Sequence, residues 1–132
     1  MKFQPDTINA QSISGYGPDW VSIRNEKITT SIVIGSNGER FDWTCERFED
    51  LTPEHFNQLA ALNTELVIFG SGHRIRFPKP ALTRALIDKQ TGLETMDNQA
   101  ACRTYNVLAA EGRRVALALL MELSQANTMA SP

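Results

Sequence analysis

The stretch Glu65–Pro80, ELVIFGSGHRIRFPKP, decides the predicted fold of this chain. Its segment Leu66–Phe69 is a short uninterrupted apolar run, which is typical of a strand buried on both faces of a sheet. Gly70-Ser71-Gly72 then ends the strand, because glycine adopts turn conformations that other residues avoid. Pro78 and Pro80 close the following loop and favour a helix that begins at about Pro80. The stretch therefore predicts a central strand that delivers a glycine turn to one edge of a sheet.

Downstream of Asp50, helical and strand patterns alternate along the chain. Apolar periodicity predicts helices at 53–62, 80–91 and 98–111, and short apolar runs predict strands at 93–96 and 114–120. The run Val115–Met121 is ambiguous, because Ala, Leu and Met favour a helix. We predict a strand there and keep a helix as the alternative, since β-α-β alternation requires parallel strands joined by crossovers.

The first third of the chain is predicted to be antiparallel β-structure. Apolar and polar residues alternate in stretches that bracket a favoured hairpin pair, Asn37-Gly38. The stretches are Ile13–Tyr16, Trp20–Arg24, Ile28–Ile34 and a return strand that carries Phe41 and Trp43. Together with the downstream alternation, this predicts an α/β fold in a single domain, 1–132, with a mixed β-sheet flanked by helices and an N-terminal antiparallel β portion.

Length and composition fit a soluble globular protein. The chain has 132 residues, of which 42% are hydrophobic and 21% charged. A net charge of −2 and an isoelectric point of about 5.7 argue against a nucleic-acid partner, because nucleic-acid binders normally carry a basic excess. No apolar run approaches the roughly 20 residues of a membrane span, so we expect no membrane insertion.

The two ends of the chain are polar. Residues 1–11 contain Pro5 and are expected to form an irregular lead-in, and residues 122–132 are expected to form a frayed tail. The N-terminal stretch has neither an apolar core region nor an Arg-rich amphipathic pattern, which are the marks of a targeting peptide. We therefore expect the protein to be cytoplasmic.

The residues that most often carry chemistry are sparse. Cys45 and Cys102 lie far apart and match neither a metal-binding nor a disulfide pattern. Cys102 lies near the start of a predicted helix, where a thiol pKa can fall, but its apolar neighbours favour a packing role. His55 and His73 are too far apart to suggest a metal site. We expect no catalytic residues, no metal and no cofactor, and we favour a protein that is not an enzyme.

Motifs around the glycine turn and the last predicted helix resemble those of a known family. They are Gly70-Ser71-Gly72, the pair Pro78 and Pro80, and the helix end Thr104–Arg113, TYNVLAAEGR. From about Ile13 to about Leu120, the chain is similar to the small α/β domains first seen in a methanogen hypothetical protein. That family includes human mitochondrial complex I assembly factor 3 and the adipogenesis-associated domain-containing protein. The resemblance implies a compact mixed-sheet domain and protein–protein contact during respiratory-complex assembly.

The glycine turn is the first candidate binding site. Ligands of open α/β sheets bind at the carboxyl ends of strands, and backbone N–H groups near a cation can hold a phosphate or carboxylate. This predicts a small-anion site at Gly70, Ser71, Gly72, His73 and Arg74. The alternative is a structural turn that needs glycine because a Cβ atom would clash. The stretch matches neither the dinucleotide fingerprint nor the Walker phosphate-binding motif.

The cationic edge after the turn is the second candidate. Arg74, Arg76 and Lys79 are the predicted contacts for an acidic protein partner. The alternative is a solvated edge on which alternating arginines discourage aggregation.

We hypothesise a non-enzymatic binding or assembly module related to respiratory-complex assembly factors. The alternative function is a small-anion or metabolite-binding protein, or an enzyme, that uses the Gly70–Gly72 rim as its pocket. The expected oligomeric state is a monomer or a weak homodimer, the latter joined through an edge strand or through a face with Trp20 and Trp43.

Overall fold

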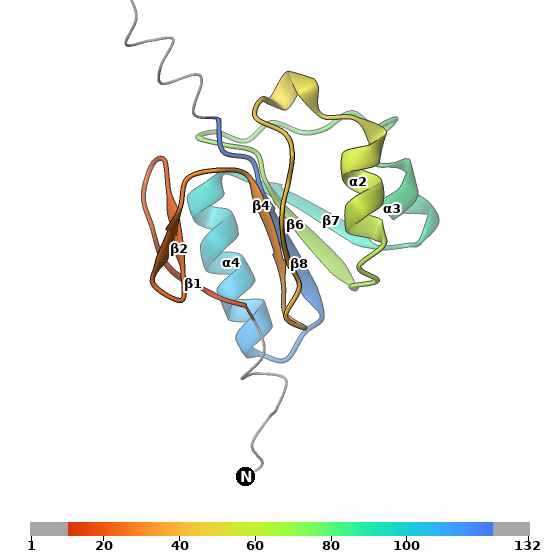
Figure 1. Cartoon of the computed structure of the whole chain (residues 1–132). Helices are drawn as coiled ribbons and strands as arrows, with labels where there is room; N and C mark the ends of the chain where they lie inside the picture. Colours follow the sequence, from red (N-terminus) through yellow and green to blue (C-terminus); the bar gives the residue numbers. More distant parts are fainter. Residues whose placement is uncertain (1–10, 123–132) are drawn as a thin grey trace, which may run out of the picture.

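The structure, a computed structural model, describes residues 11–122 and is built around a five-stranded mixed sheet (Figure 1). Its strands are β4 (Ile32–Gly35), β5 (Arg40–Asp42), β6 (Leu66–Gly70), β7 (Gly92–Met96) and β8 (Val115–Leu119). They lie in the order β5-β4-β8-β6-β7. β6 is parallel to both β7 and β8, whereas β4 is antiparallel to β5 and β8. The predicted α/β class is confirmed, and the predicted 66–69 strand is the interior strand β6, which lies between β7 and β8.

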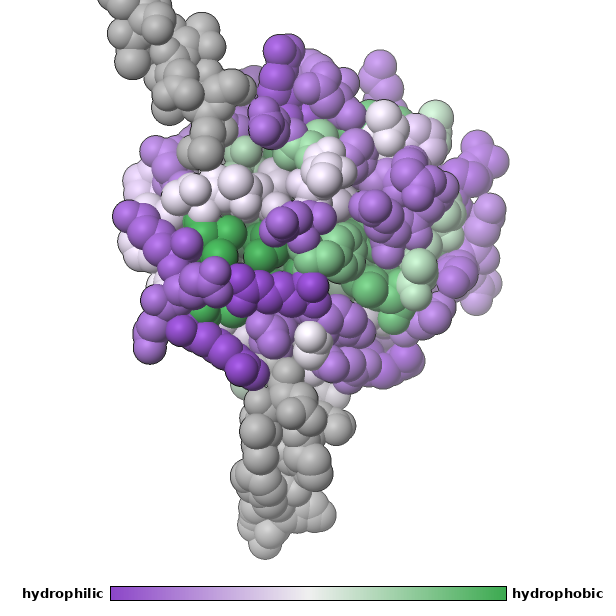
Figure 2. Space-filling model, viewed as in Figure 1, coloured by the Kyte–Doolittle hydropathy of each residue, from purple (hydrophilic) through white to green (hydrophobic). Residues whose placement is uncertain are grey.

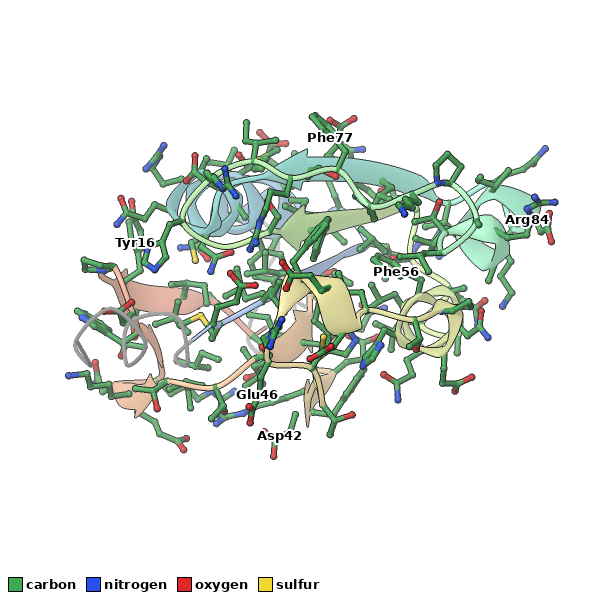
Figure 3. All side chains as sticks on the ribbon, turned by 90° about the horizontal axis from the view of Figure 1, so that it is seen from above. Tyr16, Asp42, Glu46, Phe56, Phe77 and Arg84 are labelled. Atoms are coloured by element: carbon green, nitrogen blue, oxygen red, sulfur yellow. The ribbon has the colours of Figure 1, made fainter. Side chains whose placement is uncertain are left out.

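A smaller sheet and the helices cover the two faces of the main sheet. The small antiparallel sheet contains β1 (Ile13–Tyr16), β2 (Val21–Ile23) and β3 (Glu26–Ile28). α4 (Asn98–Ala110) and this small sheet lie side by side on one face of the main sheet (Figures 1 and 3). α2 (Pro53–Ala60) and α3 (Arg84–Asp88) lie on the opposite face, and a 3₁₀ helix, Phe48–Asp50, precedes α2.

Local sequence signals set the starts of the two longer helices. Pro53 occupies the first turn of α2, and the Thr52 N–H donates to Nδ1 of His55 at 3.0 Å. At α4, the Asp97 carboxylate accepts a 3.0 Å hydrogen bond from the Ala100 N–H and so caps the helix. These contacts satisfy amide groups that the first turn of a helix leaves without partners.

β6 divides the interior into two apolar cores, because its alternating side chains point to opposite faces of the sheet. Ile68 packs toward α4, and Phe69 packs toward α2. Phe69 makes edge-to-face contacts with Trp43 and Phe56, at ring-centroid distances of 5.9 and 5.7 Å. Some members of this second core, such as Phe41, are only partly buried. Figure 2 correspondingly shows a band of apolar residues across an otherwise polar face.

The predicted strand Ile28–Ile34 is divided between the two sheets. The chain leaves the small sheet after β3 and enters the main sheet at β4. Ser31 fixes this crossing, since its hydroxyl donates to the Cys45 carbonyl and accepts from the Met121 N–H. Ile28 and Ile32 nevertheless enter the same core, which explains why the apolar alternation continues through the break.

The predicted helix at 80–91 is observed only over Arg84–Asp88. Pro80 begins a turn instead, in which the Thr83 N–H donates to the Pro80 carbonyl at 3.1 Å. The ambiguous run Val115–Met121 forms the central strand β8, as predicted. A hairpin that the sequence analysis missed joins β2 to β3 through Arg24-Asn25, both of which have positive φ angles.

Two expectations concern the ends of the chain and its tryptophans. The predicted lead-in and tail lie outside the described residues, except for Gln11, which is buried, and Glu122, which is ion-paired. Trp43 is 2% exposed, so it cannot form the dimer face with Trp20 that was considered above. That face is wrong because Trp43 belongs to the second core.

Replacing Phe69 with alanine tests the second core. The side chain is fully buried, so its truncation should lower the free energy of unfolding by about 3–5 kcal/mol. Val107, which is 56% exposed on α4, provides the matched control, and its alanine variant should stay within about 0.5 kcal/mol of the parent. Urea denaturation followed by circular dichroism measures both. Equal effects of the two substitutions would contradict the packing described.

Candidate functional site

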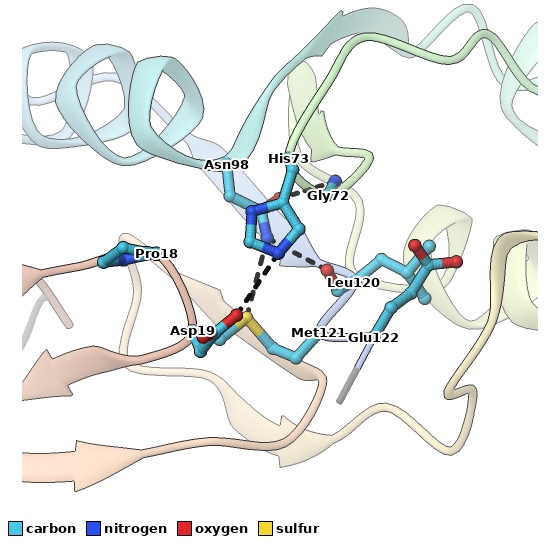
Figure 4. Close-up of a pocket in the computed structure, with 8 residues that line it drawn as sticks. All are labelled: Pro18, Asp19, Gly72, His73, Asn98, Leu120, Met121 and Glu122. Atoms are coloured by element: carbon cyan, nitrogen blue, oxygen red, sulfur yellow. Dashed lines mark hydrogen bonds and ion pairs between the residues drawn. The ribbon is translucent and has the colours of Figure 1, made fainter. Parts of the chain in front are cut away.

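The carboxyl ends of β6, β7 and β8 meet at one edge of the main sheet, because the three strands are parallel. The segments that follow them and the β1–β2 loop line a small, partly open pocket (Figure 4). The loop contributes Pro18 and Asp19, the segment after β6 contributes Gly72 and His73, and α4 contributes Asn98. The space inside the pocket is about 10 Å³, close to the minimum that holds one water molecule, so it is too small for a metabolite.

The Asn98 side chain ties these segments together (Figure 4). Its Oδ1 accepts a 3.0 Å hydrogen bond from the Gly72 N–H, and its Nδ2 donates to the Leu120 carbonyl at 2.9 Å. Nδ2 also lies 3.6 Å from the Met121 sulfur. One carboxamide therefore joins the end of β6, the start of α4 and the end of β8.

The two glycines of the turn are required by this close packing. A Cβ atom at Gly70 would lie 2.4 Å from Oδ1 of Asn98 and 2.7 Å from a methyl carbon of Leu119. Gly72 has a φ angle of +111°, which residues with a side chain rarely adopt. These observations support the structural alternative for the turn, in which glycine is needed because a Cβ atom would clash.

Ser71 is fully buried, so the prediction that it lies on an open rim is wrong. Its N–H donates to the Met96 carbonyl at 2.9 Å, and its hydroxyl donates to the Arg74 carbonyl at 2.8 Å. The same hydroxyl accepts from the Arg76 N–H at 2.8 Å. The turn therefore closes on itself through Ser71.

These hydrogen bonds argue against the anion site that was expected at Gly70, Ser71 and Gly72. The Ser71 and Gly72 amides already donate within the chain, and all three residues are buried. A phosphate or carboxylate would have to replace the Asn98 carboxamide and the Met96 carbonyl to reach them. Such exchange is costly, because the displaced buried groups would lose their partners.

Arg76 is turned inward, contrary to its predicted place among the contacts for a partner. Its guanidinium lies 2.6 Å from one carboxylate oxygen of Glu122 and also donates to the Ser71 carbonyl. The other Glu122 oxygen accepts a 2.6 Å hydrogen bond from the Phe48 N–H, and the guanidinium lies 4.7 Å from the Phe48 ring centroid. The Arg76 and Glu122 side chains are only 16% and 5% exposed. This pair joins the loop after β6 to the end of β8.

The remaining predicted site residues, His73, Arg74 and Lys79, are exposed. Nε2 of His73 lies 3.2 Å from Oδ1 of Asp19, and both side chains are about half exposed. Exposed pairs of this kind contribute little to stability, roughly 0–1 kcal/mol.

Two apolar side chains lie on the same loop and were not predicted as site residues. Phe77 is 72% exposed and Ile75 is 52% exposed. Phe77 lies at the margin of the molecule in Figure 3, whereas the labelled Phe56 lies inside. Charged and apolar residues alternate along Arg74–Phe77, and such alternation normally places the apolar side chains in the interior. Here Arg76 points inward instead, so Ile75 and Phe77 point to solvent.

Cys102 has the packing role that its neighbours suggested. It is fully buried, and burial raises the pKa of its thiol to about 12, so the thiol stays protonated at neutral pH. Within the described part of the chain, no three His, Cys, Asp or Glu side chains are grouped closely enough to hold a metal ion. No helix between residues 11 and 122 is long and apolar enough to cross a membrane.

Asn98 and Glu122 are the structurally important residues that the sequence analysis missed. A usable signal existed for both. Each follows the carboxyl end of a predicted strand within a few positions, and the ends of parallel strands meet at one sheet edge. Glu122 is also the first charge after the apolar run of β8.

Residues 13–120 match a family model described as a protein of unknown function (DUF498/DUF598). The chain belongs to this family. The match covers almost all of the described residues and confirms the resemblance noted for the Gly70–Gly72 turn and the Thr104–Arg113 helix end.

Known relatives agree with the fold. A crystal structure of a protein from Bordetella parapertussis is 34% identical, with a TM-score of 0.80 over 85% of this chain and 96% of that chain. A solution structure of a Mth938-like domain from Bordetella pertussis is 27% identical, with a TM-score of 0.78 over 96% of both chains.

The name of one relative describes it as an assembly factor of NADH dehydrogenase. The bovine NADH dehydrogenase [ubiquinone] 1 alpha subcomplex assembly factor 3 is 32% identical over 80 residues, which are 59% of this chain and 44% of the relative. The chain therefore spans less than half of the length of that relative.

Replacing Asn98 with alanine tests the tie at the carboxyl edge. The variant leaves the Gly72 N–H and the Leu120 carbonyl without partners, so the free energy of unfolding should fall by about 2–3 kcal/mol. Gln99→Ala changes the next, exposed residue of the same helix and should cost less than about 0.5 kcal/mol. Urea titration compares the two variants, and equal stabilities would refute the tie.

Proposed function

We propose that the chain is a protein-binding module that acts in the assembly of a respiratory NADH dehydrogenase. Its contact surface is formed by the exposed residues His73, Arg74, Ile75, Phe77 and Lys79, which we call the 73–79 loop surface. The observation that carries the proposal is the exposure of Phe77 and Ile75 beside two cations.

Neighbouring exposed apolar side chains, such as Ile75 and Phe77, are a feature of interaction sites, whereas isolated ones are common on any protein surface. Phe77 leaves most of its ring in water, although burial of such a ring stabilises a complex by about 1.5–3 kcal/mol. Aromatic and arginine side chains dominate the binding energy of many protein interfaces. Phe77 and Arg74 therefore fit an apolar pocket with an acidic rim on a partner.

The rigid base of the loop supports the same proposal. Ser71, Gly72 and Arg76 hold the first part of the loop, up to Arg76, through hydrogen bonds and the ion pair with Glu122. A loop held in this way loses little conformational entropy when a partner binds. The name of the bovine relative supports a role in assembly, and the small-anion alternative has no free amide at Ser71 or Gly72 to support it.

A complementation experiment in the native host tests the proposed function. A deletion strain should contain less assembled NADH dehydrogenase on a native gel, and the parent chain should restore it. Phe77→Asp should reduce restoration at least several-fold, because a carboxylate cannot enter an apolar pocket without a large desolvation cost.

Val107→Asp is the matched control, since Val107 is similarly exposed but lies on α4. It should restore assembly fully. Equal melting temperatures for both variants would show that folding is not the cause. The proposal fails if Phe77→Asp restores NADH dehydrogenase as well as the parent does.

A further inference from the structure

β7 leaves one edge of the main sheet without a strand partner, because it pairs only with β6 among the described residues. The bonds that join β7 to β6 begin at the Gly92 N–H and end at the Met96 carbonyl. In a parallel pair, this register directs Gly92, Glu94 and Met96 toward β6. The N–H and C=O groups of Leu93 and Thr95 therefore point to the open side.

The other edges of the two sheets are better protected. At β1, the Asn106 side chain accepts from the Ile13 N–H at 2.9 Å and donates to the Ile13 carbonyl at 2.8 Å, so it occupies the edge as another strand would. β3 and β5 have three residues each and carry the charges of Glu26, Lys27 and Arg40. Short, charged strands resist the addition of another strand. β7 has five residues, GLETM, with one charge and neither Lys nor Pro.

The open side of β7 is accessible. Figure 3 shows this strand at one margin of the molecule, with Phe77 projecting beyond it and with Asp42 at the opposite margin. Leu93 and Thr95 are half-buried, and Glu94 is exposed. An added strand would cover part of the surface that Leu93 and Thr95 still expose.

We propose that this edge receives an extended segment of a protein partner as a sixth strand, with a Lys or Arg of that segment opposite Glu94. This inference rests on the proposed function, because it states how the partner that contacts the 73–79 loop surface is held. Strand addition gives affinity through backbone hydrogen bonds, and side chains at alternate positions give specificity. Opposite charges across a strand pair stabilise it, whereas like charges destabilise it.

The same charge disfavours a second copy of this chain as the occupant. A centred antiparallel pairing of two β7 strands would place Glu94 opposite Glu94. In that position the two carboxylates would repel each other at the closest approach of the strands. A segment of a different protein that places a Lys or Arg opposite Glu94 avoids this repulsion.

Site-specific photocrosslinking in the native host tests the proposal. A benzophenone amino acid at position 91, just before β7, should crosslink to one segment of another protein, identified by mass spectrometry. That segment should contain an apolar alternation and a Lys or Arg. The same probe at position 42, on the opposite edge strand β5, is the control and should not crosslink to that segment.

Two variants of Thr95 separate strand addition from other contacts. Thr95→Pro removes one outward N–H and keeps the bonds to β6, because proline is tolerated where the N–H faces away from the ladder. It should lower the crosslink yield about tenfold, as expected for one lost hydrogen bond and an unpaired carbonyl. Thr95→Val keeps the N–H and should leave the yield unchanged.

Because Thr95→Pro could also lower the crosslink yield through a folding defect, a third variant tests the edge without altering the backbone. Glu94→Lys alters only an exposed side chain and should also lower the yield, and Glu in place of the partner's basic residue should restore it. Crosslinks between two copies of this chain, or full yield in both Thr95→Pro and Glu94→Lys, would overturn the strand addition. If a probe at Phe77 crosslinks and the probe at 91 does not, the edge proposal fails and the proposed function stands. If neither crosslinks, both fail.

Discussion

The carboxamide of Asn98 is the constraint on which the carboxyl edge of the sheet depends. It accepts from the Gly72 N–H and donates to the Leu120 carbonyl, so it links two parallel strands to the helix that covers them. A carboxamide can serve both groups at once because it carries an acceptor and a donor on one planar unit. Gly70 has no Cβ because that amide occupies the space.

Because of this constraint, the carboxyl edge of the sheet is closed to ligands. The carboxyl edge of an open α/β sheet is the usual place for a ligand, and here the chain's own side chains fill it. Asn98 takes the Gly72 amide, and the Arg76–Glu122 pair closes the side next to it. The surfaces that remain available are outside the edge: the apolar and cationic side chains of the 73–79 loop surface and the open backbone groups of β7. Both suit a macromolecular partner better than a metabolite.

The sequence predicted the elements that depend on local patterns. The apolar runs of β6 and β8 and the apolar periodicity of α2 and α4 each carry a signal within a few residues, and each of these elements is confirmed. The closure of the turn at Gly72 and the inward direction of Arg76 depend instead on Asn98 and Glu122, which lie 26 and 46 positions further along the sequence, respectively. Contacts between residues so far apart cannot be predicted from the spacing of residues along the sequence. The division of Ile28–Ile34 between two sheets was also not predictable from local sequence. Side chains from both sheets pack into one core, so the apolar alternation continues across the break.

An NMR titration tests most directly whether the chain itself closes this edge. The ¹H–¹⁵N resonances of Ser71 and Gly72 would be followed while inorganic phosphate, and separately acetate, is added to the folded protein. Because both amides already donate to groups of the chain, their resonances should not move in a saturable way. A saturable shift of the Ser71 and Gly72 amides, accompanied by a change at the Asn98 side-chain amide, would show that the turn opens to bind anions and would contradict the account.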